Sequence, residues 1–233
     1  AEADALNRRL VQRALDMERQ SMQAMMIYVT GKLAPSERLP VTKSELTQTL
    51  EGRAYTPQQA ELIASAQTPH NALATEIAHA AGLRAHELLT LCPVAERAAN
   101  PRPALDSKWK GRSGEIYTVQ GKGGLTREVM IPHELAARLE ERRLDAPQVV
   151  TDRGVFYQSS YDIGGGQRWS NSVSAASERT MGRSTGAHGL RHSYAQERMT
   201  ELQNRGLSRD AALETVSQEM GHFRPEITET YLR

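Results

Sequence analysis

The chain has 233 residues, of which 39% are hydrophobic and 24% charged, so it is long enough for one good-sized core or two small ones and is not disordered by composition. Its single cysteine, Cys92, excludes a disulfide framework and a cysteine-type zinc site within the chain. No apolar run approaches the roughly 20 residues that span a bilayer, so the sequence predicts a cytoplasmic protein without a membrane partner.

The N-terminal part of the sequence predicts a helical segment and a connector. Apolar residues at helical spacing between residues 3 and 29 predict one or two helices. Two glycines and two prolines interrupt residues 31–56, which predicts a connector with at most one short helix near residues 44–50. We therefore place a boundary between an N-terminal helical segment, residues 1–52, and a larger domain, residues 53–233.

Two helices are predicted directly after this boundary, and each opens on a Thr-Pro pair. In "TPQQAELIASA" Thr56 is the expected N-cap, and Pro57 takes the first helical position. In "TPHNALATEIAHAAG" Thr68 and Pro69 have the same roles. Proline suits this position because the first turn leaves its N–H groups without helical partners.

The periodicity then changes to that of a β-hairpin. "EIYTVQGKGGLTREVMIP" places two alternating runs around a glycine-rich tip that holds Lys122. Beyond it, "YDIGGGQRWS" is predicted as a loop, and the periodicity predicts further helices at residues 133–144, 168–181, 189–205, 208–220 and 225–232. The predicted fold class is mainly α with one small antiparallel β-sheet, an α+β fold.

Charge is unevenly distributed, although the formal net charge is only +1. Between Arg97 and Arg127, seven lysines and arginines stand against two acidic residues. This stretch is either a solvated loop and hairpin or a strip that faces DNA phosphates. The candidate DNA-binding residues are Lys108, Lys110, Arg112 and Arg127.

Histidines and arginines near the C-terminus suggest either a metal site or an anion site. His188 and His192, with His222 further along, could supply zinc ligands if a fourth position stayed open. However, the pair lacks the glutamate of the "HExxH" motif, and Arg191 lies between the two histidines, where its charge opposes a dication. A guanidinium instead matches the oxygens of a phosphate, so we predict an anion site and no metal. A second arginine, Arg84, occurs in "HAAGLRAHELLTL".

These segments together resemble the catalytic domain of the tyrosine recombinase and phage integrase family. "AGLRAHEL" is similar to the first arginine box of that family, and "GKGGLTREVMIP" to its hairpin with the active-site lysine. "HGLRHSYA" is similar to the His-x-x-Arg box, "EMGH" to the second-histidine box, and "ITETYL" to the nucleophile box. The step from His222 to Tyr231 also fits, and the boxes cover about residues 54–233.

The resemblance implies a role for each matching residue. Tyr231 would be the nucleophile, Arg84 and Arg191 would bind the scissile phosphate, and Lys122 would be the general acid. This agrees with the chemistry, because in-line attack on a phosphodiester places negative charge on the nonbridging oxygens, which two guanidiniums stabilise. A phenol with a pKa near 10 also needs cations or a proton acceptor beside it.

His188 and His222 would then act as supporting donors, and Glu87 would orient the first arginine. No cofactor and no metal are implied. The family would assemble as a homotetramer on two DNA duplexes, and a monomer without DNA stays open. Residues 1–52 would be the remainder of the helical core-binding domain that closes a clamp around DNA in this family.

The implied function is that of a site-specific DNA recombinase of the integrase kind, which cleaves and rejoins strands through a 3′-phosphotyrosine intermediate. We expect it to serve a bacterial mobile element, at the nucleoid, on double-stranded attachment sites, with accessory DNA-bending or directionality proteins. An Xer-like resolvase of chromosome or plasmid multimers, a type IB topoisomerase and a catalytically silent DNA-binding regulator are the alternatives. A metal-dependent hydrolase is a more distant one.

Overall fold

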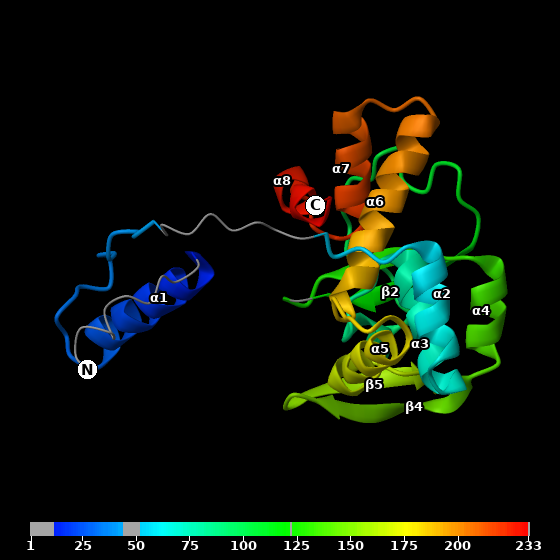
Figure 1. Ribbon diagram of the computed structural model, residues 1–233, viewed down its shortest axis with the longest axis horizontal. Coiled ribbons are helices and arrows are strands. Elements are labelled where there is room, and N and C mark those ends of the chain that lie inside the picture. Colours follow the sequence, from blue (N-terminus) through cyan, green and yellow to red (C-terminus); the bar gives the residue numbers. More distant parts are fainter. Residues whose placement is uncertain (1–11, 44–51, 122, 233) are drawn as a thin grey trace. The chain divides into compact units, whose positions relative to one another are not determined.

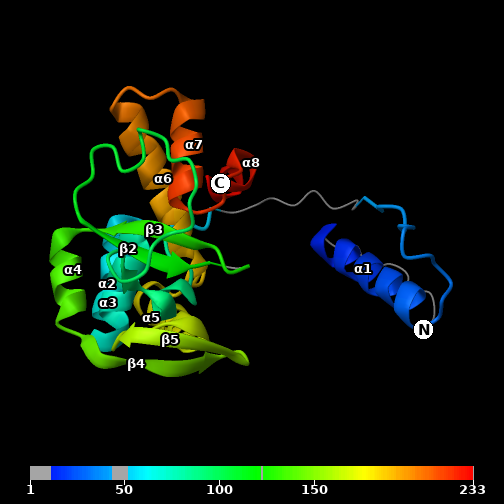
Figure 2. The same ribbon diagram turned by 180° about the vertical axis from the view of Figure 1, so that it is seen from behind.

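A computed structural model describes residues 12–43, 52–121 and 123–232 (Figures 1 and 2). The chain divides into two compact units, Ala1–Glu51 and Gly52–Arg233. In the first unit, helix α1 (Gln12–Tyr28) is followed by a segment that returns to it, since the Leu39 amide donates to Gln23 Oε1 at 3.0 Å. The helix predicted near residues 44–50 lies outside the described residues. Whether this unit is the remainder of a DNA clamp stays a prediction.

The second unit begins with the two helices that the Thr-Pro pairs predict, α2 (Pro57–Ser65) and α3 (Pro69–Ala81). Thr56 and Gln59 form a reciprocal capping box at the start of α2: Thr56 Oγ1 accepts from the Gln59 amide, and Gln59 Oε1 accepts from the Thr56 amide. The chain then enters a short 3₁₀ turn, η2 (Glu87–Thr90). The residues between α3 and η2 include the first arginine of the proposed site.

The predicted β-hairpin is present in a three-stranded antiparallel sheet of order β1-β2-β3. Strand β1 is Cys92–Pro93, β2 is Glu115–Gln120 and β3 is Thr126–Ile131. Glu115 pairs with Ile131 and Gln120 with Thr126, so the tip lies between Gln120 and Thr126. Val119, Val129 and Ile131 are fully buried, which fixes the register by placing the apolar face on the core.

The prediction of a single sheet was wrong, because the second unit contains a second, two-stranded sheet. Helix α4 (His133–Glu140) ends before residue 144, and a second hairpin follows, formed by β4 (Arg143–Asp152) and β5 (Val155–Tyr161). Its turn residues Arg153 and Gly154 have φ of 49° and 78°, as a two-residue turn with left-handed backbone requires. Arg-Gly is not among the usual pairs for such a turn, and most residues of these strands are exposed, so no buried alternation revealed them.

Four helices complete the second unit. They are α5 (Gly166–Met181), α6 (His188–Asn204), α7 (Arg209–Glu219) and the short α8 (Pro225–Thr228), and a 3₁₀ turn, η3 (Glu229–Tyr231), follows α8. In both views α6 and α7 lie side by side at one end of the unit, and the β4–β5 hairpin lies at the other. The predicted fold class, mainly helical with small antiparallel sheets, is confirmed.

Helix α6 joins two hydrophobic clusters. Leu190, in its first turn, belongs to the larger cluster of α2, α3, the three-stranded sheet and α5, whereas Tyr194 belongs to the cluster between α6 and α7. Both side chains are at most 1% exposed. The start of α6, where the His-x-x-Arg motif lies, is therefore rigidly packed from both sides. Among the described residues, no helix has the length and apolar character needed to cross a membrane.

The first turn of α6 also predicts an unusual response to a helix-favouring substitution. A Cβ at Gly189 would lie 2.3 Å from Thr185 Oγ1, 2.6 Å from Tyr55 Cε2 and 2.7 Å from the Arg53 carbonyl oxygen. Gly→Ala in a helix normally stabilises by up to about 1 kcal/mol. We expect Gly189→Ala instead to lower the free energy of unfolding by about 1 to 3 kcal/mol, measured by urea denaturation. The exposed control Gln203→Ala should change little, and a Gly189→Ala protein as stable as wild type would contradict this packing.

Candidate active site

The Tyr231 ring lies inside a group of histidines. Its centroid is 5.2 Å from that of His188, 4.8 Å from that of His192 and 5.0 Å from that of His222. The guanidinium carbon of Arg191 lies 5.6 Å from the same centroid. The structure thus brings together five of the residues that the sequence singled out, from the start of α6, the turn after α7, and η3.

Tyr231 is held at this position through its backbone. Its carbonyl oxygen accepts from His192 Nδ1 at 3.2 Å and from Gln196 Nε2 at 3.2 Å, both on α6. Because a carbonyl oxygen can only accept, Nδ1 of His192 must carry a proton. His192 therefore anchors the C-terminal turn, while the Tyr231 side chain remains 8% exposed.

Arg191 is fully buried and has one unused donor. Nη1 donates to the Gly82 carbonyl oxygen, and Nη2 donates to the Met220 carbonyl oxygen at 2.5 Å and to His222 Nε2 at 3.0 Å. Nε is buried and has no hydrogen-bond partner in the described part of the chain. Burial lowers the pKa of Arg191 to about 10, with Arg84 contributing, so the group stays cationic at neutral pH. A buried cation with a free N–H favours binding of an anion.

Glu87 forms ion pairs with three arginines at the site. Its carboxylate is fully buried and accepts from the Arg84 amide at 2.8 Å, from Arg84 Nη1 at 2.9 Å and from Arg127 Nη2 at 2.9 Å. Arg191 Nη1 lies 4.0 Å from it. Burial alone would raise the pKa of Glu87, but Arg127, Arg191 and Arg84 together lower it to about 2. Three guanidiniums and one carboxylate leave two net positive charges in this group. The Arg84 side chain is the part of it that solvent reaches, since it is 27% exposed.

The two histidines that the sequence assigned to the site are neutral at pH 7. Arg191 can only donate, so His222 Nε2 is unprotonated and His222 Nδ1–H donates to Thr228 Oγ1 at 2.9 Å. Burial, followed by the charges of Arg191 and Arg84, lowers the pKa of His222 to about 3. His188 is more exposed, yet loss of part of its water shell and the charge of Arg191 lower its pKa to about 4. Both rings therefore carry no charge at neutral pH, and His222 Nε2 is already occupied by the hydrogen bond from Arg191.

The lowered pKa of His222 predicts a loss of stability in mild acid. The unfolded chain binds a proton near the ordinary value of 6.5, but the folded chain does not until about 3. This contribution is therefore complete above pH 6.5 and is lost as the pH falls toward 3, by at most about 1.4 kcal/mol per pH unit. We expect the urea midpoint of wild type to fall between pH 7.5 and pH 5, and that of His222→Gln to fall less. Parallel pH dependences for the two proteins would contradict a buried neutral His222.

The structure describes two of the three lysines that the sequence assigned to the site and to the DNA-facing strip. Lys122 lies outside the described residues, so its role as general acid stays a prediction. Lys110 is exposed. Lys108 forms an ion pair with Glu128 at 2.7 Å and lies 5.0 Å from the ring centroid of Trp109. Contact of Lys108 and Lys110 with DNA stays a prediction.

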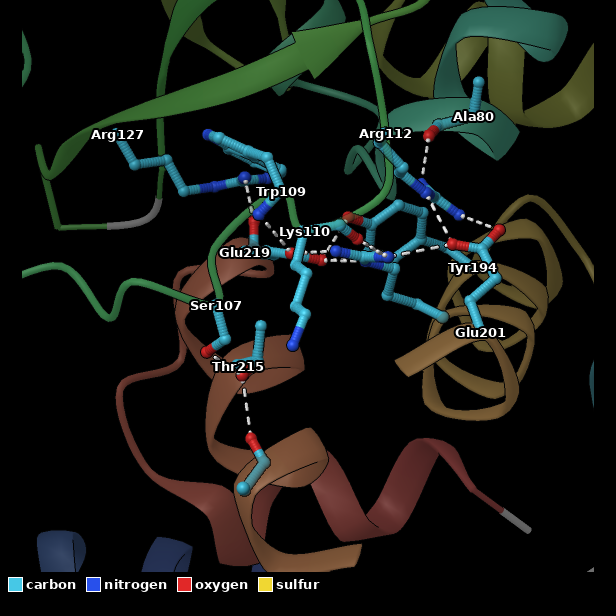
Figure 3. Close-up of polar contacts among 12 residues, drawn as sticks. Ala80, Ser107, Trp109, Lys110, Arg112, Arg127, Tyr194, Glu201, Thr215 and Glu219 are labelled. Carbon is cyan, nitrogen blue, oxygen red and sulfur yellow. Dashed lines mark hydrogen bonds and ion pairs between the residues drawn. The ribbon is translucent and has the colours of Figure 1, made fainter. Parts of the chain in front are cut away.

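The two arginines of that strip are engaged inside the protein. Arg112 Nε and Nη2 donate to the two carboxylate oxygens of Glu201 at 2.9 and 3.0 Å, as Figure 3 shows. Arg127 is only 4% exposed and is paired with Glu87. Both guanidiniums are therefore held by carboxylates of the protein, which the charge pattern did not reveal, and contact of Arg112 or Arg127 with DNA stays a prediction.

The sequence analysis missed a buried network next to the site. Glu219, at the end of α7, accepts from Arg198 Nε at 2.8 Å, from Arg198 Nη2 at 2.9 Å and from the Tyr194 hydroxyl at 2.8 Å (Figure 3). Glu219 and Arg198 are both fully buried. A signal was available, because Arg191, Tyr194 and Arg198 have the spacing of residues on one helical face. The described residues contain no group of three or more histidine, cysteine or acidic side chains that could hold a metal ion.

The fold is similar to that of solved DNA-bound recombinases. The XerH site-specific recombinase bound to its difH substrate in a pre-cleavage complex matches 98% of this chain with a TM-score of 0.57 and 16% identity. The Tn1549 transposon integrase in complex with transposon right end DNA matches 96% of this chain and 76% of its own, with a TM-score of 0.54 and 15% identity. This chain spans 64% of the XerH chain.

At these identities the likeness establishes the fold: the chain has the fold of tyrosine recombinase catalytic domains. No protein-family model matches the sequence, and no curated protein matches it.

Proposed function

We propose that this protein is a tyrosine-type site-specific DNA recombinase, which cleaves and rejoins DNA strands through a 3′-phosphotyrosine intermediate on Tyr231. One observation carries the proposal: the Tyr231 ring lies beside a buried guanidinium, Arg191, whose Nε–H has no partner among the described residues. A phosphate oxygen would satisfy that donor once the groups that bury Arg191 in the DNA-free protein move aside. The DNA-bound state of the structures that share this fold supports the same substrate class.

In the proposed cleavage step, the Tyr231 oxygen attacks the phosphorus and the bond from phosphorus to the 5′ oxygen breaks. Negative charge grows on the nonbridging oxygens, where Arg191 and Arg84 stabilise it. The hydroxyl proton of Tyr231 must leave as the new bond forms. We assign it to solvent, because His222 Nε2 already accepts from Arg191, and pKa values of about 3 and about 4 make His222 and His188 weak bases. We assign protonation of the departing 5′ oxygen to Lys122.

The covalent step explains how strands are rejoined without ATP. The phosphotyrosine linkage is itself a phosphodiester, so a different 5′ hydroxyl can attack it, release Tyr231 and restore the DNA backbone. The groups at the site that carry this exchange are side chains of the protein, and no cofactor takes part in the steps proposed. We further propose a bacterial mobile element as the setting, double-stranded attachment sites as the substrate, and a homotetramer on two duplexes as the active assembly.

The test is covalent trapping on nicked DNA. Duplexes that tile the sequence on either side of the gene would each be nicked so that the short fragment with the new 5′ hydroxyl diffuses away after cleavage. They would be incubated with the protein and separated under denaturing conditions. A 5′-labelled strand that becomes linked to protein through its 3′ end is the expected result. A 5′-linked adduct would contradict the mechanism. Specific binding without an adduct on any duplex would favour the silent regulator.

A further inference from the structure

Arg127 links the two halves of the site. It is the second residue of β3, and only 4% of it is exposed. Arg127 Nη2 donates to Glu87 Oε2 at 2.9 Å, and Nη1 donates to the Glu219 carbonyl oxygen at 2.7 Å (Figure 3 shows the second contact). Glu87 in turn holds Arg84. The Arg127 guanidinium therefore connects the Glu87 carboxylate, which binds Arg84, to the end of α7.

The stem of Arg127 also packs against the turn that carries His222. Gly221 has φ of 70°, and a Cβ there would lie 2.4 Å from Arg127 Cδ and 2.9 Å from its Nε. Only glycine leaves room for this approach and adopts the backbone easily. In the same turn the Met220 carbonyl accepts from Arg191 Nη2. Displacing the turn would therefore move both His222 and an acceptor of Arg191.

Glu219, the residue of α7 that Arg127 contacts, is held in place by its own side chain. The Glu219 carboxylate accepts two bonds from Arg198, one from Tyr194 and one from the Trp109 amide at 3.0 Å. Figure 3 shows these contacts converging on one carboxylate, which the protein interior surrounds. Since charged hydrogen bonds of this kind are strong, Glu219 is a rigid support for Arg127.

We propose that Arg127 is a positioning residue for the reaction: it holds the Arg84–Glu87–Arg191 group, the His222 turn and the hairpin that carries Lys122 in one fixed arrangement. The inference rests on the proposed function, because it names a further residue on which cleavage depends. Arg127 touches neither the DNA nor the reacting atoms in this scheme. Its planar fork satisfies two acceptors that face it from different elements, whereas a lysine presents all its donors from one nitrogen.

The experiment compares Arg127→Lys and Arg127→Gln with wild type on the trapping substrate. We expect DNA affinity within about threefold of wild type and a single-turnover cleavage rate lower by about 100-fold in both variants, because small displacements of reacting groups have effects of that size. In Arg127→Gln, Glu87 also loses the cation that lowers its pKa most, so its pKa rises. The acid limb of the pH–rate profile should therefore move to higher pH, measured only at pH values where urea titration shows that the variant is still folded.

Two controls separate positioning from folding. Arg138→Lys makes the same chemical change in a bidentate pair with Glu76, between α4 and α3, away from the site. Val173→Ala opens a small cavity in the core under α5 and lowers stability without touching the site. Both should cleave at nearly the wild-type rate. If Arg127→Lys also cleaves within threefold of wild type, or if Val173→Ala loses as much activity, the proposal is overturned.

A readout without DNA keeps this inference separate from the proposed function. Arg127 is among the charges that lower the pKa of His222. We expect the His222 imidazole, followed by NMR during a pH titration, to titrate at higher pH in Arg127→Gln and to show altered shifts in Arg127→Lys. Unchanged His222 signals in both variants would overturn the positioning role even if the trapping assay succeeds. Failure of wild type to form an adduct would overturn the proposed function alone.

Discussion

Tyr231→Phe is expected to abolish the covalent DNA adduct, with a drop in cleavage rate on the order of 10⁴-fold or more. The substitution removes only the oxygen that would attack phosphorus. The ring that packs among His188, His192 and His222 remains, and the backbone carbonyl still accepts from His192. Folding and DNA binding should therefore be unchanged, and the adduct on nicked DNA is the quantity to measure.

A matched control is Tyr157→Phe, which makes the same change in the β4–β5 hairpin. Other tyrosines are held elsewhere: the Tyr117 and Tyr161 hydroxyls donate to Glu140 at 2.6 and 2.7 Å. They are poor substitutes for the nucleophile, because burial and Glu140 raise the pKa of both. Tyr157→Phe should form adduct like wild type. An undiminished adduct with Tyr231→Phe would remove Tyr231 from the mechanism.

Arg191→Lys is expected to lower the cleavage rate by about 10³-fold, although it keeps a basic side chain. The substitution removes the free Nε–H, and an ammonium group cannot serve Gly82, Met220 and His222 together as the guanidinium does. Removing one preorganised donor to a developing oxyanion typically lowers a rate by about 10²- to 10³-fold. Burial would also lower the pKa of the new amine and weaken its charge. Single-turnover adduct formation measures the effect.

Loss of stability must be separated from loss of chemistry in this variant. Buried carbonyl oxygens that lose a charged donor destabilise a protein by about 1 to 3 kcal/mol each, so a lower urea midpoint is expected as well. The assay would therefore be run at a temperature where Arg191→Lys is fully folded, beside Val173→Ala as a destabilised protein with an intact site. Cleavage by Arg191→Lys within tenfold of wild type would show that the guanidinium geometry is not what the reaction requires.

Features that depend on near neighbours were predictable from the sequence. The Thr-Pro pairs at residues 56–57 and 68–69 marked the starts of α2 and α3, because a first-turn proline acts within a few residues. Thr56 also makes the predicted side-chain cap bond, whereas Thr68 occupies the N-cap position without one. The β2–β3 hairpin followed from its alternation and glycine-rich tip for the same reason. The residues that now surround Tyr231 were also found from the sequence, since their spacing within short motifs carries the pattern.

The environment of those residues was decided by the tertiary structure alone. Arg127 looked like a DNA contact in a basic strip, but it is buried, because it meets Glu87, 40 positions away, and the Glu219 carbonyl, 92 positions away. The β4–β5 hairpin was missed because its strands are largely exposed and carry little periodic signal. Burial, ion pairing and the lowered pKa values of His222 and Glu87 arise from groups that only folding brings within a few ångströms. Local patterns therefore name the candidate side chains of the site, whereas long-range packing sets their charge and their burial.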